Sequence, residues 1–451
     1  MMKRILRGLR GIVVFALILS FPLQAQEKAS HFKLENGMEV FCYERHSLPL
    51  IHVVVGVNLG SKDETKKTSG MVHILEHCAL FRGTETRSGT QVAQDVREHG
   101  AYFNAHTGRD LSLFELAVPS EYADWGLKNQ KNILFQLKIT QEELEKEKQI
   151  ILEEINQVED DPLKYATSLI YQNLFQSHPY QKPIYGNKKN IENATGEQLE
   201  KFHKKFFVPS NCVLSVVGDF SLEEMKEKIK SIFENIPEGN VSPRQYPQAP
   251  PLEKKIEKKK EMDVQQGYLV IGVPAPDYNH PDQYAVDLLT EIMGRGVKPL
   301  LNTPLQKRRV NVHSISMSYN SLKYGGVIQI NVRIDPKNIH TAQREIIQYL
   351  KKTRRLNYSK NDYMGAQRFH ALDYLKSAQN RIKHRFHQSQ EKGRNLAVSL
   401  VRFMLLNKDP ERGNYIDQIE KLSSTDIRKA AGNYLSTSEY VVVSILPQKK
   451  E

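Results

Sequence analysis

The chain has 451 residues, of which 39% are hydrophobic and 26% charged, and its formal net charge at pH 7 is +12. This composition is typical of a folded protein with a sizeable core, and it excludes a chain that is disordered throughout. Because lysines and arginines are interspersed with glutamates, the surplus of positive charge does not indicate a nucleic-acid-binding surface.

The first 25 residues have the order of a secretory signal peptide. Basic residues within the first ten positions precede an apolar run over 11–21, and Ala25 offers a small residue for cleavage. The apolar run is shorter than the ~20 residues that a membrane span requires. We therefore expect an exported protein, periplasmic or secreted, that has no stable membrane span once residues 1–25 are removed.

Three cysteines, Cys42, Cys78 and Cys212, are present in the chain. An odd and small number argues against a disulfide framework in an exported protein. All three are predicted to be packed thiols of the core.

Two strands are expected between residues 40 and 59, followed by a helix that contains His73, Glu76 and His77. Histidines four residues apart lie on one face of a helix and can bind one Zn²⁺ through their imidazole nitrogens. The glutamate can accept a proton from a water that attacks a carbonyl. This is the inverted H-x-x-E-H form of the zinc-hydrolase signature. The alternative is a helix that carries two histidines by chance.

A helix near 91–99 and strands around 101–118 precede a longer helix, which begins at a capping box and ends before Pro162. Two glutamates fall within its core-facing stripe, where a buried carboxylate requires a metal, a proton or a cation partner. The predicted stripe consists of Glu147, Ile150, Ile151, Glu154, Ile155 and Val158. The residues expected on its solvated face are Glu142, Glu145, Lys148 and Glu153.

The remaining elements of the first half are helices through residue 173 and near 196–206, a strand over 211–218 and a helix over 221–235. Residues 242–260, rich in proline and then lysine, are predicted to be a linker. The pattern then repeats, with a strand (267–273), a helix (282–293), strands (312–319 and 325–335), helices (338–353 and from 362 onward) and a last strand (440–446). The prediction is an α+β fold of two tandem homologous halves, 26–241 and 261–451, each with a mixed or antiparallel sheet packed against helices.

The sequence resembles the pitrilysin/insulinase superfamily of inverzincin zinc metallopeptidases, in particular its small bacterial branch related to mitochondrial processing peptidase. Besides the histidine motif, the resemblance rests on Leu34-Glu-Asn-Gly37, Phe81-Arg-Gly-Thr84, Gly100-Ala-Tyr-Phe-Asn-Ala-His-Thr107, His178-Pro-Tyr180 and residues 209–219. It implies that the two halves form a clamshell. It also implies that Glu154, and not Glu153, is the third zinc ligand, with Glu147 supporting the site.

The resemblance further implies an exported zinc endopeptidase for unfolded or short peptides, in which Glu76 activates a water held by the zinc. Asn104 and Ala105 match the substrate-binding strand of the family, to which a peptide adds as a further strand. A non-catalytic or structural subunit of a processing-peptidase-like complex is the alternative function.

The second half departs from the pattern of the family. Members with a complete single-chain site carry an arginine and, seven residues later, a tyrosine, and an alignment on Leu301 and Leu305 puts Gln306 and His313 at these places. His313 can donate a hydrogen bond to an oxyanion, or it has no role. We therefore expect a heterodimer with a paralogous subunit that supplies the Arg/Tyr pair. A homodimer with His313 or Arg309 as the donor is the alternative.

Overall fold

The structure is a computed structural model that describes residues 28–247, 249–296, 299–359, 373–406 and 415–448. The predicted signal peptide and the first part of the helix predicted from residue 362 lie outside these residues. In the described parts of the chain, no helix is long and apolar enough to cross a membrane.

The first half forms a six-stranded sheet with the order β1-β2-β6-β3-β5-β4. β2 and β6 are parallel, the other neighbours are antiparallel, and β4 lies at an edge. β1 was not predicted, because Phe32 is its only large apolar residue. The strands are β1 (Lys28–Lys33), β2 (Glu39–Glu44), β3 (Leu50–Val57), β4 (Tyr102–Thr107), β5 (Ser112–Pro119) and β6 (Cys212–Gly218).

Except for α5, the helices of this half enclose a hydrophobic core between themselves and one face of the sheet. The three cysteines are free and buried, as predicted. The helices are α1 (Met71–Phe81), α2 (Gly89–Glu98), α3 (Ala123–Phe135), α4 (Gln141–Asp160), α5 (Pro162–Leu174), α6 (Lys188–Glu192), α7 (Gly196–Phe206) and α8 (Leu222–Phe233).

The second half forms a five-stranded sheet with the order β7-β11-β8-β10-β9, in which β7 and β11 are parallel. Its strands are β7 (Ile256–Met262), β8 (Gly267–Ala275), β9 (Val312–Leu322), β10 (Gly325–Ile334) and β11 (Val441–Pro447). Its helices are α9 (Gln283–Gly294), α10 (Thr303–Lys307), α11 (Ile339–Thr353), α12 (Tyr374–Gln390), α13 (Gly393–Leu406), α14 (Tyr415–Lys421) and α15 (Ser424–Ala430). The predicted α+β fold with one sheet per half is confirmed. The boundaries at residues 241 and 260 remain a prediction, and β7 begins within the predicted linker.

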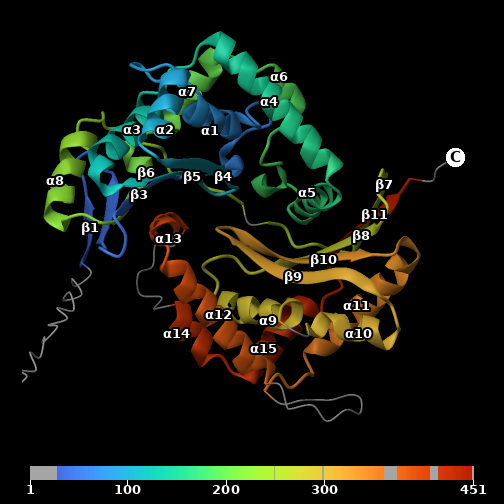
Figure 1. Cartoon of the computed structure of the whole chain (residues 1–451). Helices are drawn as coiled ribbons and strands as arrows, with labels where there is room; N and C mark the ends of the chain where they lie inside the picture. The colour runs from blue at the N-terminus through green and yellow to red at the C-terminus, as the bar shows by residue number, and fades with distance from the viewer. Residues whose placement is uncertain (1–27, 248, 297–298, 360–372, 407–414, 449–451) are drawn as a thin grey trace, which may run out of the picture.

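Each half covers the open face of the other half's sheet with one helix (Figure 1). α5 of the first half packs on β8 and β11, where Gly272 leaves room for Ile170. α13 of the second half packs on β3 and β6, where Gly56 leaves room for Val401. The apolar surface buried in these two contacts joins the halves.

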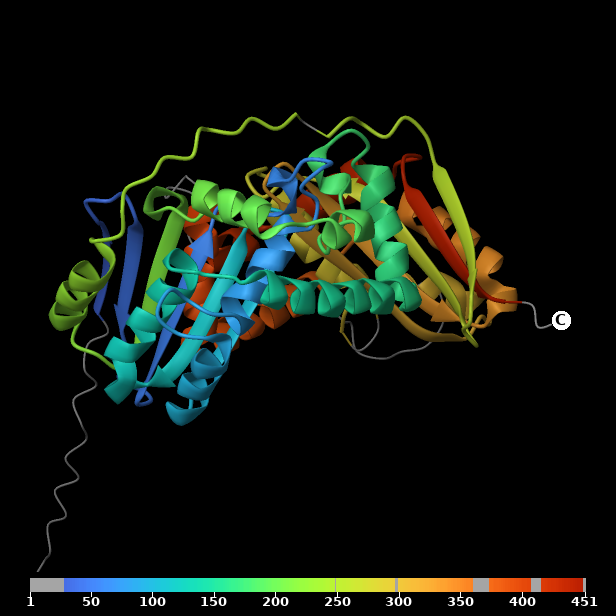
Figure 2. The same cartoon turned by 90° about the horizontal axis from the view of Figure 1, so that it is seen from above.

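The segment between α8 and β7 runs along the outside of both halves (Figure 2). Arg244 of this segment forms an ion pair with Asp63 and donates a hydrogen bond to the Asn58 carbonyl at 2.6 Å. Tyr246 also donates to the Asp63 carboxylate. The connection between the halves is therefore fixed to the surface of the first half.

Candidate metal centre

Helix α1 places His73 and His77 beside α4. The helix begins at Met71 after Gly70, and the φ of +103° at Gly70 is a conformation that favours glycine. The carboxylate of Glu64 accepts a hydrogen bond from the Val72 N–H at 3.0 Å and so caps the helix. The apolar residues of α1 except Phe81, which is 54% exposed, are buried in the core, and the two histidine side chains are 6% exposed.

Helix α4 supplies the third side chain of the cluster. Its predicted capping box, Thr140 with Glu143, is present. Oε2 of Glu154 lies 3.5 Å from Nε2 of His73 and 3.4 Å from Nε2 of His77. One potential ligand atom from each of the three residues lies within 4.8 Å of the others. The neighbouring Glu153 is exposed, so the structure brings Glu154 to the histidines and not Glu153.

The spacing of these atoms fits a zinc ion. Ligand atoms that bind a tetrahedral zinc at ~2.1 Å lie ~3.4 Å from one another. The two separations from the Glu154 carboxylate match this value. Two imidazoles and one carboxylate are also a typical ligand set of catalytic zinc, in which the fourth position stays open.

The surroundings shift the pKa values of His73 and His77 in opposite directions. Burial, assisted by the nearby His77, lowers the pKa of His73 to about 3, so this ring stays neutral. Burial also acts to lower the pKa of His77, but the hydrogen bond to Glu147 and the charges of Glu154 and Glu147 outweigh it and leave that pKa raised. The bond between His77 Nδ1 and Glu147 Oε2 is 2.9 Å long and leaves Nε2 free to face Glu154.

Glu147 is a fully buried carboxylate with two partners. One oxygen bonds to His77, and the other forms an ion pair with the guanidinium of Arg82. The sequence predicted that a buried carboxylate here needs a metal, a proton or a cation, but it did not identify Arg82 as the cation. The available signal was its position, one residue after Phe81 at the C-terminal end of the motif helix.

Glu76 lies on the same helix, beside the edge strand β4. Burial raises the pKa of Glu76, while the nearby Thr107 at the end of β4 and the nearby His77 oppose this shift. The carboxylate therefore lies near His77 and near the strand that was predicted to bind a substrate.

Asn104 and Ala105 lie in β4, which pairs only with β5 among the described strands. Asn104 is exposed and Ala105 is 9% exposed. The Ala105 N–H donates a hydrogen bond to the Asn104 side-chain oxygen at 2.9 Å. The Asn104 side chain therefore occupies the Ala105 N–H, a backbone group to which an added strand could bond.

The structure does not bring Gln306 or His313 to the cluster. Gln306 is exposed on α10, and His313 is exposed at the start of β9, near Asp335. Within the described ranges, neither side chain forms a hydrogen bond or an ion pair with the histidines, Glu154 or Glu76. Among the described residues, no contact of His313 supports a role in substrate binding, which stays a prediction.

Several residues of α4 differ from the predicted stripe: the Glu154 side chain is 37% exposed and Val158 is only partly buried. Ile150 is 45% exposed, whereas Lys148, expected on the solvated face, is 4% exposed. The Lys148 ammonium group donates hydrogen bonds to Glu145 at 2.7 Å and to the Glu192 carbonyl at 3.1 Å. Its aliphatic stem can be buried because the charged end reaches these oxygens.

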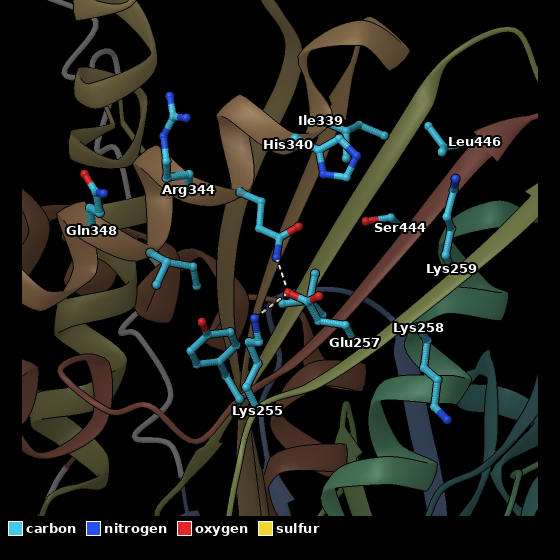
Figure 3. A pocket seen from close by; sticks show the side chains of 14 residues that line it. Lys255, Glu257, Lys258, Lys259, Ile339, His340, Arg344, Gln348, Ser444 and Leu446 are labelled. Atoms are coloured by element: carbon cyan, nitrogen blue, oxygen red, sulfur yellow. Dashed lines mark hydrogen bonds and ion pairs between the residues drawn. The ribbon is translucent and has the colours of Figure 1, made fainter.

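A surface hollow of about 450 Å³ lies away from the metal centre, between β7, β11 and α11 (Figure 3). Lys255, Lys259, His340 and Arg344 line it, and Glu257 bonds to Lys255 and Gln343 within it. None of the predicted site residues lines this hollow.

Solved structures of other proteins share this fold. A protease from Helicobacter pylori superposes with a TM-score of 0.84 at 23% identity, covering 93% of this chain and 100% of that one. A structure from Pseudomonas fluorescens, described as a peptidase M16 inactive domain, has a TM-score of 0.81 at 19% identity, covering 94% and 99%.

Relatives in sequence are named as zinc proteases or processing-peptidase subunits. The zinc protease PqqE of Helicobacter pylori is 24% identical over 99% of both chains. An uncharacterized zinc protease of Rickettsia bellii is 26% identical, over 90% of this chain and 95% of the relative. A probable mitochondrial-processing peptidase subunit beta of Schizosaccharomyces pombe is 28% identical over 68% of each.

Two family models match consecutive parts of the chain. The model of insulinase (peptidase family M16) matches residues 41–188, and the model of the peptidase M16 inactive domain matches residues 193–368. Together with the shared fold, these matches show that the chain belongs to the M16 family of zinc peptidases.

Proposed function

We propose that this protein is an exported zinc-dependent endopeptidase that hydrolyses unfolded or short peptides. The observation that carries the proposal is the approach of Glu154 Oε2 to both histidine Nε2 atoms, at 3.5 Å and 3.4 Å, with Glu76 on the same helix. The zinc-protease names of its relatives support the reaction class. The proposal of export rests on the predicted signal peptide. Identifying the N-terminal residue of the protein recovered from the cell envelope or medium tests it.

His73, His77 and Glu154 would hold the zinc, which supplies a Lewis acid that lowers the pKa of water toward ~7 when bound. Glu76 accepts the proton of the water that attacks the peptide carbonyl, and it passes this proton to the departing amine. Burial raises the pKa of Glu76 and so brings its basicity closer to that needed near neutral pH. Glu147 orients His77, and β4 holds the peptide by backbone hydrogen bonds.

The Glu76→Gln variant tests the proposed reaction. It should keep the fold and the zinc but lose ~10²- to 10⁴-fold in peptide turnover, because glutamine cannot accept the proton. Turnover of an unstructured peptide and metal content are measured on the same samples. Undiminished turnover would exclude Glu76 as the base. A wild-type protein that holds zinc without cleaving any peptide would instead favour the role of a non-catalytic or structural subunit.

We further propose that the protein works with a paralogous subunit. Gln306 and His313 occupy the places where the arginine and tyrosine are expected, and both are exposed away from the cluster. The Schizosaccharomyces pombe relative is named as the beta subunit of a processing peptidase, which supports a pair of unlike chains. The alternative is a homodimer with Arg309 or His313 of one copy as the donor.

A further inference from the structure

One residue of the second half reaches the predicted substrate strand of the first. Arg394 lies in the first turn of α13, and its guanidinium carbon is 4.8 Å from the centroid of the Tyr102 ring in β4. Its Nε donates a hydrogen bond to the carboxylate of Glu115 in β5. The Glu115 side chain is 7% exposed and the Arg394 side chain 41% exposed, so the carboxylate of this ion pair is shielded from water and the guanidinium is partly exposed.

The start of α13 is fixed against the first sheet by further contacts. Arg45 donates hydrogen bonds to the carbonyls of Gln390 at 2.8 Å and Glu391 at 3.3 Å. Gly393 packs directly on the ring of His52 in β3. Arg394 therefore approaches Tyr102 from a backbone that is held in place.

The contact continues from Tyr102 to the free edge of β4. The Tyr102 hydroxyl accepts a hydrogen bond from the Asn104 side-chain amide at 2.9 Å, and the Asn104 oxygen accepts one from the Ala105 N–H at 2.9 Å. Asn104 stands opposite Glu115 in the antiparallel register, so the two side chains share the face that α13 approaches. Arg394, Tyr102 and Asn104 thus form one chain of contacts that ends at a backbone group of the edge.

We propose that Arg394 is a positioning residue that, through Tyr102 and Asn104, fixes the conformation of the edge of β4, from which an added peptide strand displaces the Asn104 oxygen as it bonds to the Ala105 N–H. This rests on the proposed peptidase function and names the part that the second half of this chain plays in it. Since β4 would hold the peptide backbone equally before and during the reaction, the contact acts on KM and leaves kcat nearly unchanged.

Steady-state kinetics of the zinc-loaded full chain with an unstructured peptide test the proposal. Arg394→Gln should raise KM roughly two- to fivefold, the effect of losing one partly exposed cation–π contact, with kcat nearly constant. Tyr102→Phe keeps the ring but removes the acceptor for Asn104, so it should also raise KM. Arg402→Gln is the matched control, because Arg402 is exposed on the same helix. It should leave KM unchanged.

Loss of Arg394 also leaves Glu115 buried without its cation, which can destabilise the fold. The double variant Arg394→Gln/Glu115→Gln removes this unpaired charge and should remain folded. A positioning role predicts that KM stays raised in the double variant. A return of KM to the wild-type value would show that Arg394 only neutralises Glu115, and it would overturn the proposal.

Peptide binding to the zinc-free protein provides a readout that does not depend on turnover. Fluorescence anisotropy of a labelled peptide should show binding to Arg394→Gln that is weaker by the same two- to fivefold factor. Binding to Arg402→Gln should be unchanged. Unchanged binding in Arg394→Gln would contradict the inference even if the protein cleaves peptides. Failure of the wild-type protein to cleave any peptide while it binds one normally would contradict the proposed function alone.

Discussion

At the scale of single residues, Glu153 and Glu154 are chemically identical neighbours with different surroundings. Glu154 faces both histidines, whereas Glu153 is exposed and accepts a hydrogen bond from Asn156. We expect about one zinc per wild-type chain, as in other three-ligand catalytic sites. Glu154→Gln should lower this content sharply, while Glu153→Gln should retain it. Metal analysis of the purified proteins checks the expectation, and equal zinc in both variants would contradict the ligand set.

Arg82 provides a second prediction at this scale. Because Glu147 is fully buried, Arg82→Gln leaves its carboxylate without a cation, and loss of one partner of a buried pair typically costs about 3 kcal/mol or more. The free energy of unfolding of the zinc-free protein should fall by that order. Zinc affinity should fall ~10- to 100-fold, because Glu147 orients His77.

Denaturant unfolding and competition with a chelator measure the two effects of Arg82→Gln. Arg97→Gln, at the exposed C-terminal end of α2, is the matched control and should leave both quantities unchanged. If Arg82→Gln behaves like this control, the ion pair does not support the site.

At the scale of elements, the ends of β2 and β6 are joined through His46. Its ring bonds to Asp219 at 2.6 Å and to Glu44 at 3.0 Å, and these bonds raise the pKa of His46. A raised pKa in the folded state means that the stabilisation is fully present below the unfolded pKa of about 6.5 and is lost as the pH rises through the folded pKa.

Thermal unfolding of His46→Gln across this range tests the link. The difference in Tm between wild type and His46→Gln should be largest below the unfolded pKa of about 6.5 and should shrink as the pH rises through the folded pKa. The effect should be small, because the His46 side chain is 40% exposed. His384→Gln, on the exposed side of α12, is the control. A Tm difference that does not vary with pH would exclude His46 as its source.

The elements also show what local sequence can predict. α4 was located correctly because its capping box and Pro162 are local signals. Which of its residues are buried depends on packing with other helices, so Ile150 and Lys148 were misassigned. β7 was missed because its lysine-rich sequence becomes a strand by pairing with β11, almost two hundred residues later.

Some residues of the candidate site could likewise be predicted from local sequence, and others could not. His73, Glu76 and His77 share one helical turn, and Glu147 and Glu154 share the phase of one helix, so spacing alone could select them. Arg394 and Tyr102 could not be selected, because they are distant in the sequence and meet only when α13 crosses to the other half. Hydrophobic periodicity could not predict that α5 and α13 each pack on the sheet of the other half, because an apolar helix face does not specify which sheet it covers.

At the scale of the whole molecule, the second half packs on the first, but none of its described arginines or tyrosines forms a hydrogen bond or an ion pair with His73, His77, Glu154 or Glu76. Without a well-placed donor, the oxyanion of the tetrahedral intermediate loses stabilisation, at a cost of ~10²- to 10³-fold in kcat for one missing donor. We therefore expect slow peptide turnover by the isolated chain. An exported paralogue that carries the pair should raise kcat by a comparable factor.

Assays of the chain alone and after mixing with the paralogue test this expectation, with co-elution in size-exclusion chromatography as evidence of a complex. A partner whose arginine and tyrosine are both replaced should bind without raising kcat, which separates donation of these groups from general stabilisation. The Glu76→Gln chain with the intact partner should stay inactive, because the base would still be missing. Full activity of the isolated chain, unaffected by His313→Ala and by the partner, would show that the site of this chain needs neither His313 nor the arginine–tyrosine pair of a partner.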